Sequence, residues 1–409
     1  MDTRDTLRKL VEGKRDQVIA LQKDLTAVPA LAPQNGGTGE TEKARVLAGW
    51  LTRLGLGTAE SLPVPDPRVP GGERPNLLLT LPGRTPERSF WIMSHMDIVP
   101  PGELSLWESD PYALVVKGDR LIGRGVEDNQ QGLVSSVIAA LCLKEAGLVP
   151  PRTVKLLFVA DEETGSDFGI QALVKRPGLF GPRDEALVPD GGSEDGSQIE
   201  IAEKSLLWLR FRVRGRQCHA STPQKGVNAF EAGSHLVVRL GVLAERYGAE
   251  DHLFDPPTST FTPTKKEANV PNVNTLPGED VFYLDSRILP REDVDEVISQ
   301  VRSICDGVQR DFGVGVDIQT VQRASSPPTP ADAPVVTALK RAVKDVYGVE
   351  GKTVGIGGGT VGAFLRKIGI PTVVWGKIGE AAHQPNEFCL LPNLLGDAVV
   401  MSRLMMDEG

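Results

Sequence analysis

The sequence predicts a two-domain α/β protein in which a small α+β domain is inserted into a larger domain. The chain has 409 residues, which is more than one hydrophobic core usually spans. Continuous apolar segments such as 153–160 alternate with helical patterns, as expected when helices cover both faces of a mostly parallel sheet. From about residue 204 the segments alternate apolar and polar residues, which is typical of a sheet with one exposed face.

The larger domain is predicted from elements at both ends of the chain. Apolar residues at helical spacing predict its helices, and short apolar runs predict its strands. The helices are expected at residues 3–25, 40–55, 130–147 and 392–407, and the strands at 76–81, 89–95, 113–118, 153–160, 185–190 and 372–375. We therefore assign residues 1–203 and 322–409 to one discontinuous catalytic domain with a mixed, mostly parallel sheet.

The inserted domain is predicted at residues 204–321. Its strands are expected at 205–215, 269–276, 280–288 and 314–321, and its helices at 227–247 and 291–308. The resulting order of strand, helix, strand, strand, helix and strand is that of a ferredoxin-like α+β sandwich. In the first strand, alternation places Trp208, Arg210 and Arg212 on one face. A large aromatic residue beside arginines is a composition favoured at protein interfaces.

Composition and charge exclude several classes of function. The formal net charge of −9 argues against a nucleic-acid partner. The four cysteines are scattered without a C-x-x-C pair, which suits reduced thiols. There is no apolar run near 18 residues, and the N-terminus is charged and lacks an apolar segment. We therefore expect a cytoplasmic protein without a membrane partner.

Acidic residues and histidines follow the predicted buried strands, where the carboxyl ends of parallel strands form the ligand-binding edge of a sheet. These residues are His95, Asp97, Asp128, Asp161, Glu162, Glu163, Asp190 and His383. Each group has an ordinary explanation, such as a hydrogen-bonded pair, a solvated acidic turn or a helix cap. Charged residues nevertheless avoid burial unless they are paired or bind a metal, so their shared position predicts one metal site.

The order of the motifs resembles that of the metallopeptidase family of aminoacylase, acetylornithine deacetylase, succinyl-diaminopimelate desuccinylase and bacterial carboxypeptidase G. In chain order the matching motifs are SHMDIVP, WESDPY, GRGVED, DEETG, PDGG, HASTP, NxNT, DSR, GGGT and HQPNE. They span roughly residues 90–390. Each motif alone is of modest specificity, whereas the ordered set is highly specific.

The resemblance implies a ligand set for two metal ions. His95 and Asp190 would bind one ion, Glu163 and His383 the other, and Asp128 would bridge them. Mixed histidine and carboxylate ligands suit two Zn²⁺ ions per subunit, with Co²⁺ or Mn²⁺ possible. The resemblance also implies that the peptide bond after the bridging aspartate, here Asp128–Asn129, is cis.

The resemblance further implies roles for residues around the metals. Asp97 would orient His95, and Glu162 would be the general base. His219 would polarise the scissile carbonyl from the inserted domain of a partner subunit, so that the enzyme is a homodimer joined through this domain, which also acts as a lid. The substrate carboxylate would be bound by Arg287, Asn274, Gly358, Gly359 and Thr360.

These residues predict a metal-dependent amidohydrolase or peptidase. It would use a metal-bridging hydroxide to cleave the amide bond of an N-acyl amino acid or small peptide with a free carboxylate. One alternative is a dinuclear aminopeptidase, but that enzyme needs an acidic group for the substrate amine, whereas Arg287 suits a carboxylate. The other alternative is a catalytically inactive metal-binding or scaffold homologue, which the retention of Glu162 disfavours.

A few residues depart from the pattern or stand outside it. Val361-Gly362 occupy the place where the family often has an aspartate, which affects the expected substrate contacts and not the metals. Glu103 and Glu127 lie near the motifs, and we expect both on the solvated surface. Cys218 is adjacent to His219, but no base for it is evident, so we interpret it as an incidental small residue.

Overall fold

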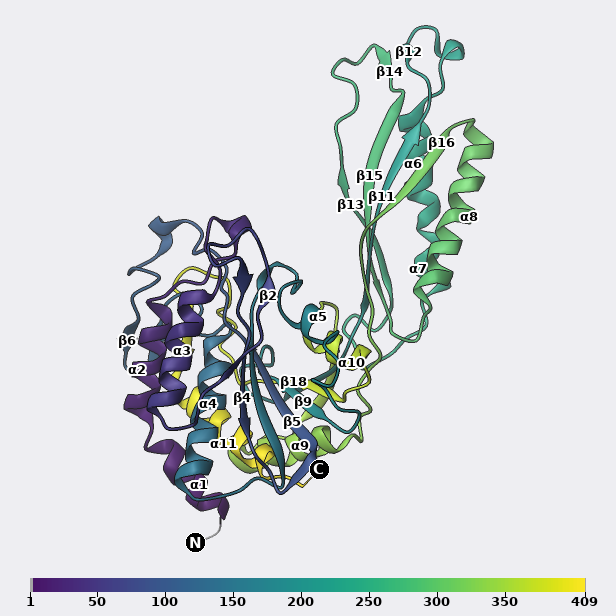
Figure 1. Cartoon of the computed structure of the whole chain (residues 1–409). Coiled ribbons are helices and arrows are strands. Elements are labelled where there is room, and N and C mark those ends of the chain that lie inside the picture. The colour runs from purple at the N-terminus through teal and green to yellow at the C-terminus, as the bar shows by residue number, and fades with distance from the viewer. Residues whose placement is uncertain (1–2, 409) are drawn as a thin grey trace. The chain divides into compact units, whose positions relative to one another are not determined.

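The computed structural model describes residues 3–408, which form two compact units (Figure 1). The first contains the described residues up to Ile201, together with Thr329–Val354 and those from Phe364 onward. The second contains Ala202–Pro328 and Gly355–Ala363. The last of these segments was assigned to the catalytic domain from the sequence. It belongs to the second unit because Gly355 N donates to Leu253 O at 2.7 Å and Gly357 O accepts from Arg287 at 2.8 Å.

An eight-stranded mixed sheet runs through the first unit. Its order is β1 (Glu60–Ser61), β4 (Leu77–Leu81), β8 (Arg152–Val159), β5 (Thr85–His95), β9 (Glu185–Val188), β18 (Thr372–Val374), β10 (Gln198–Glu203) and β17 (Lys352–Ile356). The pairs β8–β5, β5–β9 and β9–β18 are parallel, whereas β1–β4, β4–β8 and β18–β10 are antiparallel. The predicted mixed α/β sheet is confirmed, with its parallel part at the centre.

Helices surround this sheet, and most of them match the predicted ones. They are α1 (Thr3–Glu12), α2 (Arg15–Thr26), α3 (Thr41–Arg53), α4 (Gln130–Glu145), α5 (Ile170–Leu173), α9 (Pro334–Tyr347), α10 (Gly362–Lys367) and α11 (Leu391–Met405). Helix α4 is buried along almost its whole length and packs against α11 and β5. The single helix expected at 3–25 is interrupted at Gly13–Lys14, where glycine weakens a helix.

Short strands connect these layers. They are β2 (Val64–Pro65) paired with β3 (Glu73–Arg74), and a small sheet of β19 (Phe388–Leu390), β7 (Arg120–Ile122) and β6 (Val115–Lys117). Along residues 3–408 we find no helix with both the length and the apolarity that crossing a bilayer requires.

The second unit is an α+β sandwich with ferredoxin-like connectivity, as predicted. Its sheet has the order β13 (Thr260–Lys266), β15 (Glu279–Ile288), β11 (Ser205–Arg214) and β16 (Gly315–Ala324), with all neighbours antiparallel. Helices α6 (Ala229–Leu240) and α8 (Val294–Phe312) cover one face, and α7 (Val242–Arg246) follows α6 (Figure 1). The alternating apolar residues of β11, from Leu207 to Val213, supply the core beneath them.

One predicted strand of this unit is wrong. The segment 269–276 is mainly an exposed loop, and the second strand is β13 at Thr260–Lys266. Pro263 interrupts the pattern of that segment, and the structure tolerates it on an edge strand where the register shifts between Pro263 and Lys265. Two short strands, β12 (Cys218–His219) and β14 (Thr275–Leu276), pair beyond the main sheet.

Candidate metal centre

Five residues predicted as metal ligands converge at one edge of the first unit's sheet. His95 ends β5, and Asp190 follows β9 by two residues. Glu163 lies in the turn after β8, Asp128 lies two residues before the start of α4, and His383 lies in the loop before β19. Because β5, β8 and β9 are parallel neighbours, their carboxyl ends bring these side chains together.

The distances divide the cluster into two halves that share Asp128. His95 Nε2 lies 2.8 Å from Asp128 Oδ1 and 3.6 Å from Asp190 Oδ1. His383 Nε2 lies 3.0 Å from Asp128 Oδ2 and 3.2 Å from Glu163 Oε2. Each oxygen of Asp128 therefore faces a different histidine, which is the arrangement that a bridging carboxylate requires.

The donor set fits divalent cations. Ligand atoms of His95, Asp128 and Glu163 lie within 4.8 Å of one another, and so do those of His95, Glu162 and Asp190. Among the described residues, the buried Oε1 of Glu163 has no hydrogen-bond partner, a costly state that a bound cation would relieve. Glu162, predicted as the general base, is thus also close enough to contact an ion.

Electrostatics at the cluster favour added positive charge. Burial raises the pKa of Glu162 well above its usual value, and it also raises the pKa values of Glu163 and Asp190. Burial opposes the charged form of His95, but Asp190 and Asp128 raise its pKa well above the usual value. Hydrogen bonds to Asp128 and Glu163 raise the pKa of His383 to about 10. Each of these shifts reflects carboxylates crowded in a buried space, which a cation would neutralise.

Asp97 connects two of the ligand-bearing segments. Its backbone oxygen lies 3.0 Å from His95 Nδ1, and its carboxylate accepts the backbone N–H groups of Glu162 at 3.1 Å and Glu163 at 3.0 Å. The side chain is fully buried. Asp97 therefore fixes the imidazole of His95 through its backbone oxygen and the acidic turn through its carboxylate.

Two glutamates brace the loops that carry Asp128 and His383. Glu387 accepts the backbone N–H groups of Gly125, Glu127 and Asp128 at 3.0 to 3.1 Å, and its Oε2 lies 2.6 Å from Nη1 of Arg124. Glu127 in return accepts the N–H groups of residues 379, 381 and 382 in the His383 loop.

The expectation that Glu127 lies on the solvated surface is wrong, because it is only 4% exposed. Its three backbone donors compensate for its burial. Both bracing glutamates lie inside the motifs GRGVED and HQPNE, and that position is the signal from which they could have been found. Glu103 is exposed, as expected.

Asn129 positions the predicted ligand Asp190. Its Nδ2 donates to Pro189 O and to Asp190 Oδ1, both at 2.7 Å. The Asp128–Asn129 peptide bond is cis, as the resemblance implied. The residue after Asp128 therefore holds the carboxylate of Asp190.

The remaining predicted site residues belong to the second unit and form two groups. Arg287 donates from Nη1 to Gly357 O at 2.8 Å, and Thr360 Oγ1 donates to Glu203 at 2.5 Å, so Arg287 lies beside the Gly357–Thr360 segment. His219 and Asn274 lie instead on the β12–β14 pair, where Ala220 N donates to Asn274 O at 2.9 Å. The structure does not bring these two groups together within the unit.

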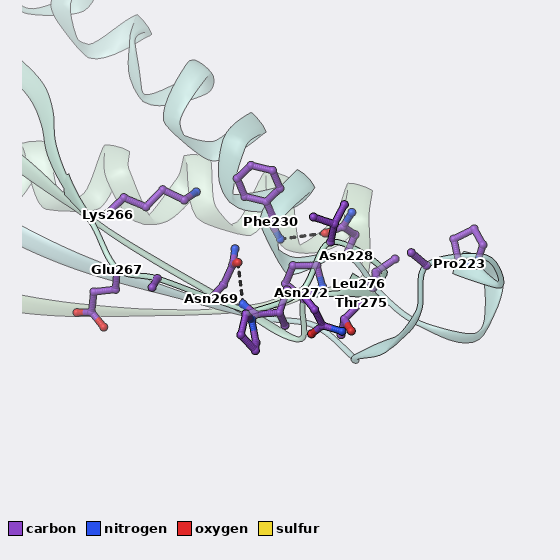
Figure 2. A pocket seen from close by; sticks show the side chains of 15 residues that line it. Pro223, Asn228, Phe230, Lys266, Glu267, Asn269, Asn272, Thr275 and Leu276 are labelled. Carbon is purple, nitrogen blue, oxygen red and sulfur yellow. Dashed lines mark hydrogen bonds between the residues drawn. The ribbon is translucent and has the colours of Figure 1, made fainter.

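The β12–β14 pair borders an open hollow of about 680 Å³ (Figure 2). Figure 2 shows Asn269, Asn272, Thr275, Phe230 and Lys266 among the residues that line it. His219 is exposed, and its Nδ1 lies 2.7 Å from Ser221 Oγ. The imidazole is thus held in place at the end of the unit and remains open to solvent.

Comparisons with known proteins find similar sequences and a similar fold. The model of the family described as Peptidase family M20/M25/M40 matches residues 91–407. A metallohydrolase of Methanococcus maripaludis is 36% identical over 94% of this chain and 97% of its own length. A succinyl-diaminopimelate desuccinylase of Dinoroseobacter shibae is 26% identical over 95% of this chain and 98% of its own. The crystal structure of aminopeptidase PepT from Bacillus cereus superposes with a TM-score of 0.78 at 20% identity, covering 96% of this chain and 98% of that one.

Proposed function

The chain belongs to peptidase family M20/M25/M40, and from this premise we propose that it is a two-metal hydrolase of amide bonds next to a free carboxylate. Its substrate is an N-acyl amino acid or a small peptide. The observation that carries the proposal is the position of Asp128 between His95 and His383, with one carboxylate oxygen within 3.0 Å of each imidazole.

We assign the ligands from the pairing of these contacts. His95 and Asp190 would hold one ion, Glu163 and His383 would hold the other, and Asp128 would serve both. The mixed donors suit Zn²⁺, Co²⁺ or Mn²⁺. When bound, two such ions supply Lewis-acid polarisation of the substrate carbonyl and an activated water.

Glu162 is the general base of the proposed reaction. Its carboxyl group shares a cluster of possible ligand atoms with His95 and Asp190, so it lies where a proton can be exchanged with a water held by the ions. Glu162 accepts a proton from the attacking water as the new C–O bond forms. It then delivers that proton to the leaving nitrogen as the C–N bond breaks, which yields a carboxylate and an amine.

Arg287 and the segment Gly357–Thr360 bind the carboxylate end of the substrate. A guanidinium group offers paired donors to a carboxylate, and the backbone of Gly358, Gly359 and Thr360 lies on the adjacent segment. A substrate carboxylate suits the positively charged side chain of Arg287, whereas the amine of an aminopeptidase substrate does not.

His219 and Asn274 act on the substrate bound by the partner subunit. Arg287 and Glu279 are eight residues apart on β15, which corresponds to roughly 26 Å at about 3.3 Å per residue. The pair β12–β14 lies beyond the Glu279 end of β15. A small substrate cannot span that distance, so we propose a homodimer through the second unit in which His219 of the partner subunit polarises the carbonyl.

A substrate screen tests the proposed function. The metal-loaded protein is incubated with N-acetyl and N-succinyl amino acids, dipeptides, carboxamide-capped copies of each, and aminopeptidase substrates that have a free amine and a blocked carboxylate. Released amine is measured, with Glu162→Gln as the inactive control.

We expect hydrolysis of one class of free-carboxylate substrate and weak or no hydrolysis of its capped copy. Exclusive cleavage of substrates with a blocked carboxylate would indicate an aminopeptidase. A protein that binds two metals and cleaves none of these compounds would indicate a scaffold.

A further inference from the structure

The Asp-Ser-Arg motif places a second charged group against the arginine that binds the substrate carboxylate. Asp285 and Arg287 are two residues apart on β15 and therefore share one face of the sheet. Asp285 Oδ1 accepts from Arg287 Nε at 2.7 Å, and Asp285 Oδ2 accepts from Nη2 at 3.0 Å. The two side chains are 24% and 29% exposed, so this bidentate pair is mostly sheltered from water.

The guanidinium is held from two further directions. Its Nη1 donates to the backbone oxygen of Gly357 at 2.8 Å. The ring of Trp208, which pairs with Asp285 across β11 and β15, has its centroid 5.9 Å from the guanidinium carbon. A carboxylate, a carbonyl and an indole together restrict the rotation of a side chain that is otherwise flexible.

A count of donors shows what remains for a ligand. A guanidinium has five N–H groups, and the contacts to Asp285 and Gly357 use three of them. The two that remain lie on different terminal nitrogens, one on Nη1 and one on Nη2. Two donors on neighbouring atoms match the two oxygens of one further carboxylate.

We propose that Asp285 is a positioning residue for substrate recognition. It occupies the Nε side of Arg287 and thereby presents the two remaining donors to the substrate carboxylate. The cost of ordering the arginine is met before the substrate arrives, which is the general advantage of preorganisation. This inference rests on the proposed role of Arg287 and adds the residue that orients it.

A competing role for Asp285 predicts the opposite result. If its carboxylate only occupied donors that the substrate needs, its neutralisation would strengthen binding of the substrate. Orientation by Asp285 predicts weaker binding after neutralisation. The sign of the change in KM therefore separates the two roles.

The same sheet offers a matched control. Arg214 and Asp317 form a bidentate pair between β11 and β16, with Nη2–Oδ1 and Nε–Oδ2 distances of 2.8 Å. That pair is about half exposed, and its guanidinium has no contact with the Gly357–Thr360 segment among the described hydrogen bonds. Asp317→Asn thus makes the same chemical change away from Arg287.

The experiment compares Asp285→Asn, Asp317→Asn, Arg287→Met and the double variant of Asp285 and Arg287. Each protein is assayed with the best free-carboxylate substrate and its carboxamide copy. We expect Asp285→Asn to raise KM for the carboxylate substrate by about 10- to 100-fold, the size of loss known for misplaced binding groups. We expect kcat, the KM of the carboxamide and all constants of Asp317→Asn to change little. In the Arg287→Met background, Asp285→Asn should add no further loss.

A lower KM for the carboxylate substrate, an equal loss for both substrates, or an additional loss in the Arg287→Met background would overturn the proposal. If Arg287→Met leaves the preference for carboxylate over carboxamide unchanged, the proposed role of Arg287 fails, and the proposal fails with it. Asp285→Glu provides a second variant in case the asparagine protein does not fold. Its longer carboxylate should give a KM between those of the wild type and Arg287→Met.

Discussion

Replacement of Glu387 by glutamine should reduce both the stability of the first unit and its affinity for metal. In the wild type the two carboxylate oxygens accept four donors: Arg124 Nη1 and Gly125 N on Oε2, and the N–H groups of Glu127 and Asp128 on Oε1. Glutamine keeps one acceptor oxygen and points an NH₂ group at two of these donors. The side chain of Arg124, 1% exposed, also loses its counterion.

The expected magnitude follows from these contacts. Breaking one side of a buried ion pair costs about 3–5 kcal/mol, and leaving a buried N–H without an acceptor costs about 1–3 kcal/mol. The remaining oxygen of the glutamine still accepts from some of the four donors. We therefore expect the free energy of unfolding to fall by about 4 kcal/mol, a large effect for one substitution. The released backbone of Asp128 should also weaken metal binding.

Two measurements check this prediction. Denaturant unfolding of the metal-free protein gives the stability, and calorimetric titration with Zn²⁺ gives the affinity. Glu279→Gln is the control, because Glu279 pairs with Arg212 in an exposed ion pair that should contribute less than about 1 kcal/mol. A loss for Glu387→Gln no greater than that of the control, or unchanged zinc affinity, would refute the bracing role.

Three further predictions concern catalysis, assembly and pH. Glu162→Gln should leave metal content nearly unchanged and lower kcat by about 10²- to 10⁴-fold, and undiminished turnover would rule out its role as the base. A mixture of inactive Glu162→Gln and His219→Ala proteins should regain part of the activity in hybrid dimers, and no recovery after verified subunit exchange would contradict the shared site. Burial raises the pKa of Asp397 from 3.8 to about 7, so its proton stabilises the fold at low pH and this contribution is lost as pH rises through about 7. Asp397→Asn should therefore stabilise the protein at pH 8 by up to about 4 kcal/mol and change little at pH 4, as thermal unfolding at both values can test; a less stable variant at pH 8 would refute the shift.

Asparagine suits the Asp397 position for a structural reason. The carboxyl group accepts from Gln131 Nε2 at 2.9 Å and from Lys377 N at 3.3 Å on one oxygen, and from Tyr347 OH at 2.7 Å on the other. The Tyr347 hydroxyl also lies 3.0 Å from Asn393 O, to which it can donate when it accepts from an amide instead. The substitution therefore reproduces the protonated acid's acceptor for Gln131 and Lys377 and its donor to the Tyr347 hydroxyl.

Much of the first unit's site could be predicted from the sequence, partly from a structural rule and partly from the family resemblance. Ligands gather at the carboxyl ends of parallel strands, and His95, Asp190 and Glu163 each follow an apolar run that is long enough to identify. The family resemblance supplied the order of the motifs. The structure brings these residues together in one cluster. The distances between their side chains could not be obtained from the sequence.

The roles of Glu127 and Glu387 were not predictable in the same way. Each side chain binds backbone N–H groups of a loop about 250 residues away in the chain. The motifs could single out the two glutamates, but backbone donors carry no sequence signal, so the partners could not be predicted. The same reason applies to the Gly355–Ala363 segment, whose place in the second unit depends on pairing with Leu253 and Arg287.

The prediction of secondary structure was wrong where the local sequence of a segment disagreed with its position in the fold. Pro263 interrupts the strand pattern of its segment, yet an edge strand has room for it at an irregular register. Strands β10 and β17 and helix α9 were also missed, because their apolar patterns are short or follow the proline-rich segment 324–334. These elements complete the sheet and do not carry the proposed metal ligands.

The central claim is that His95, Asp128, Glu163, Asp190 and His383 hold two divalent ions, and anomalous X-ray diffraction from zinc-loaded crystals tests it most directly. We expect two anomalous peaks per chain, about 3.5–4 Å apart, one on each side of Asp128. A single peak, or zinc bound away from these side chains, would contradict the two-metal centre from which the proposed reaction follows.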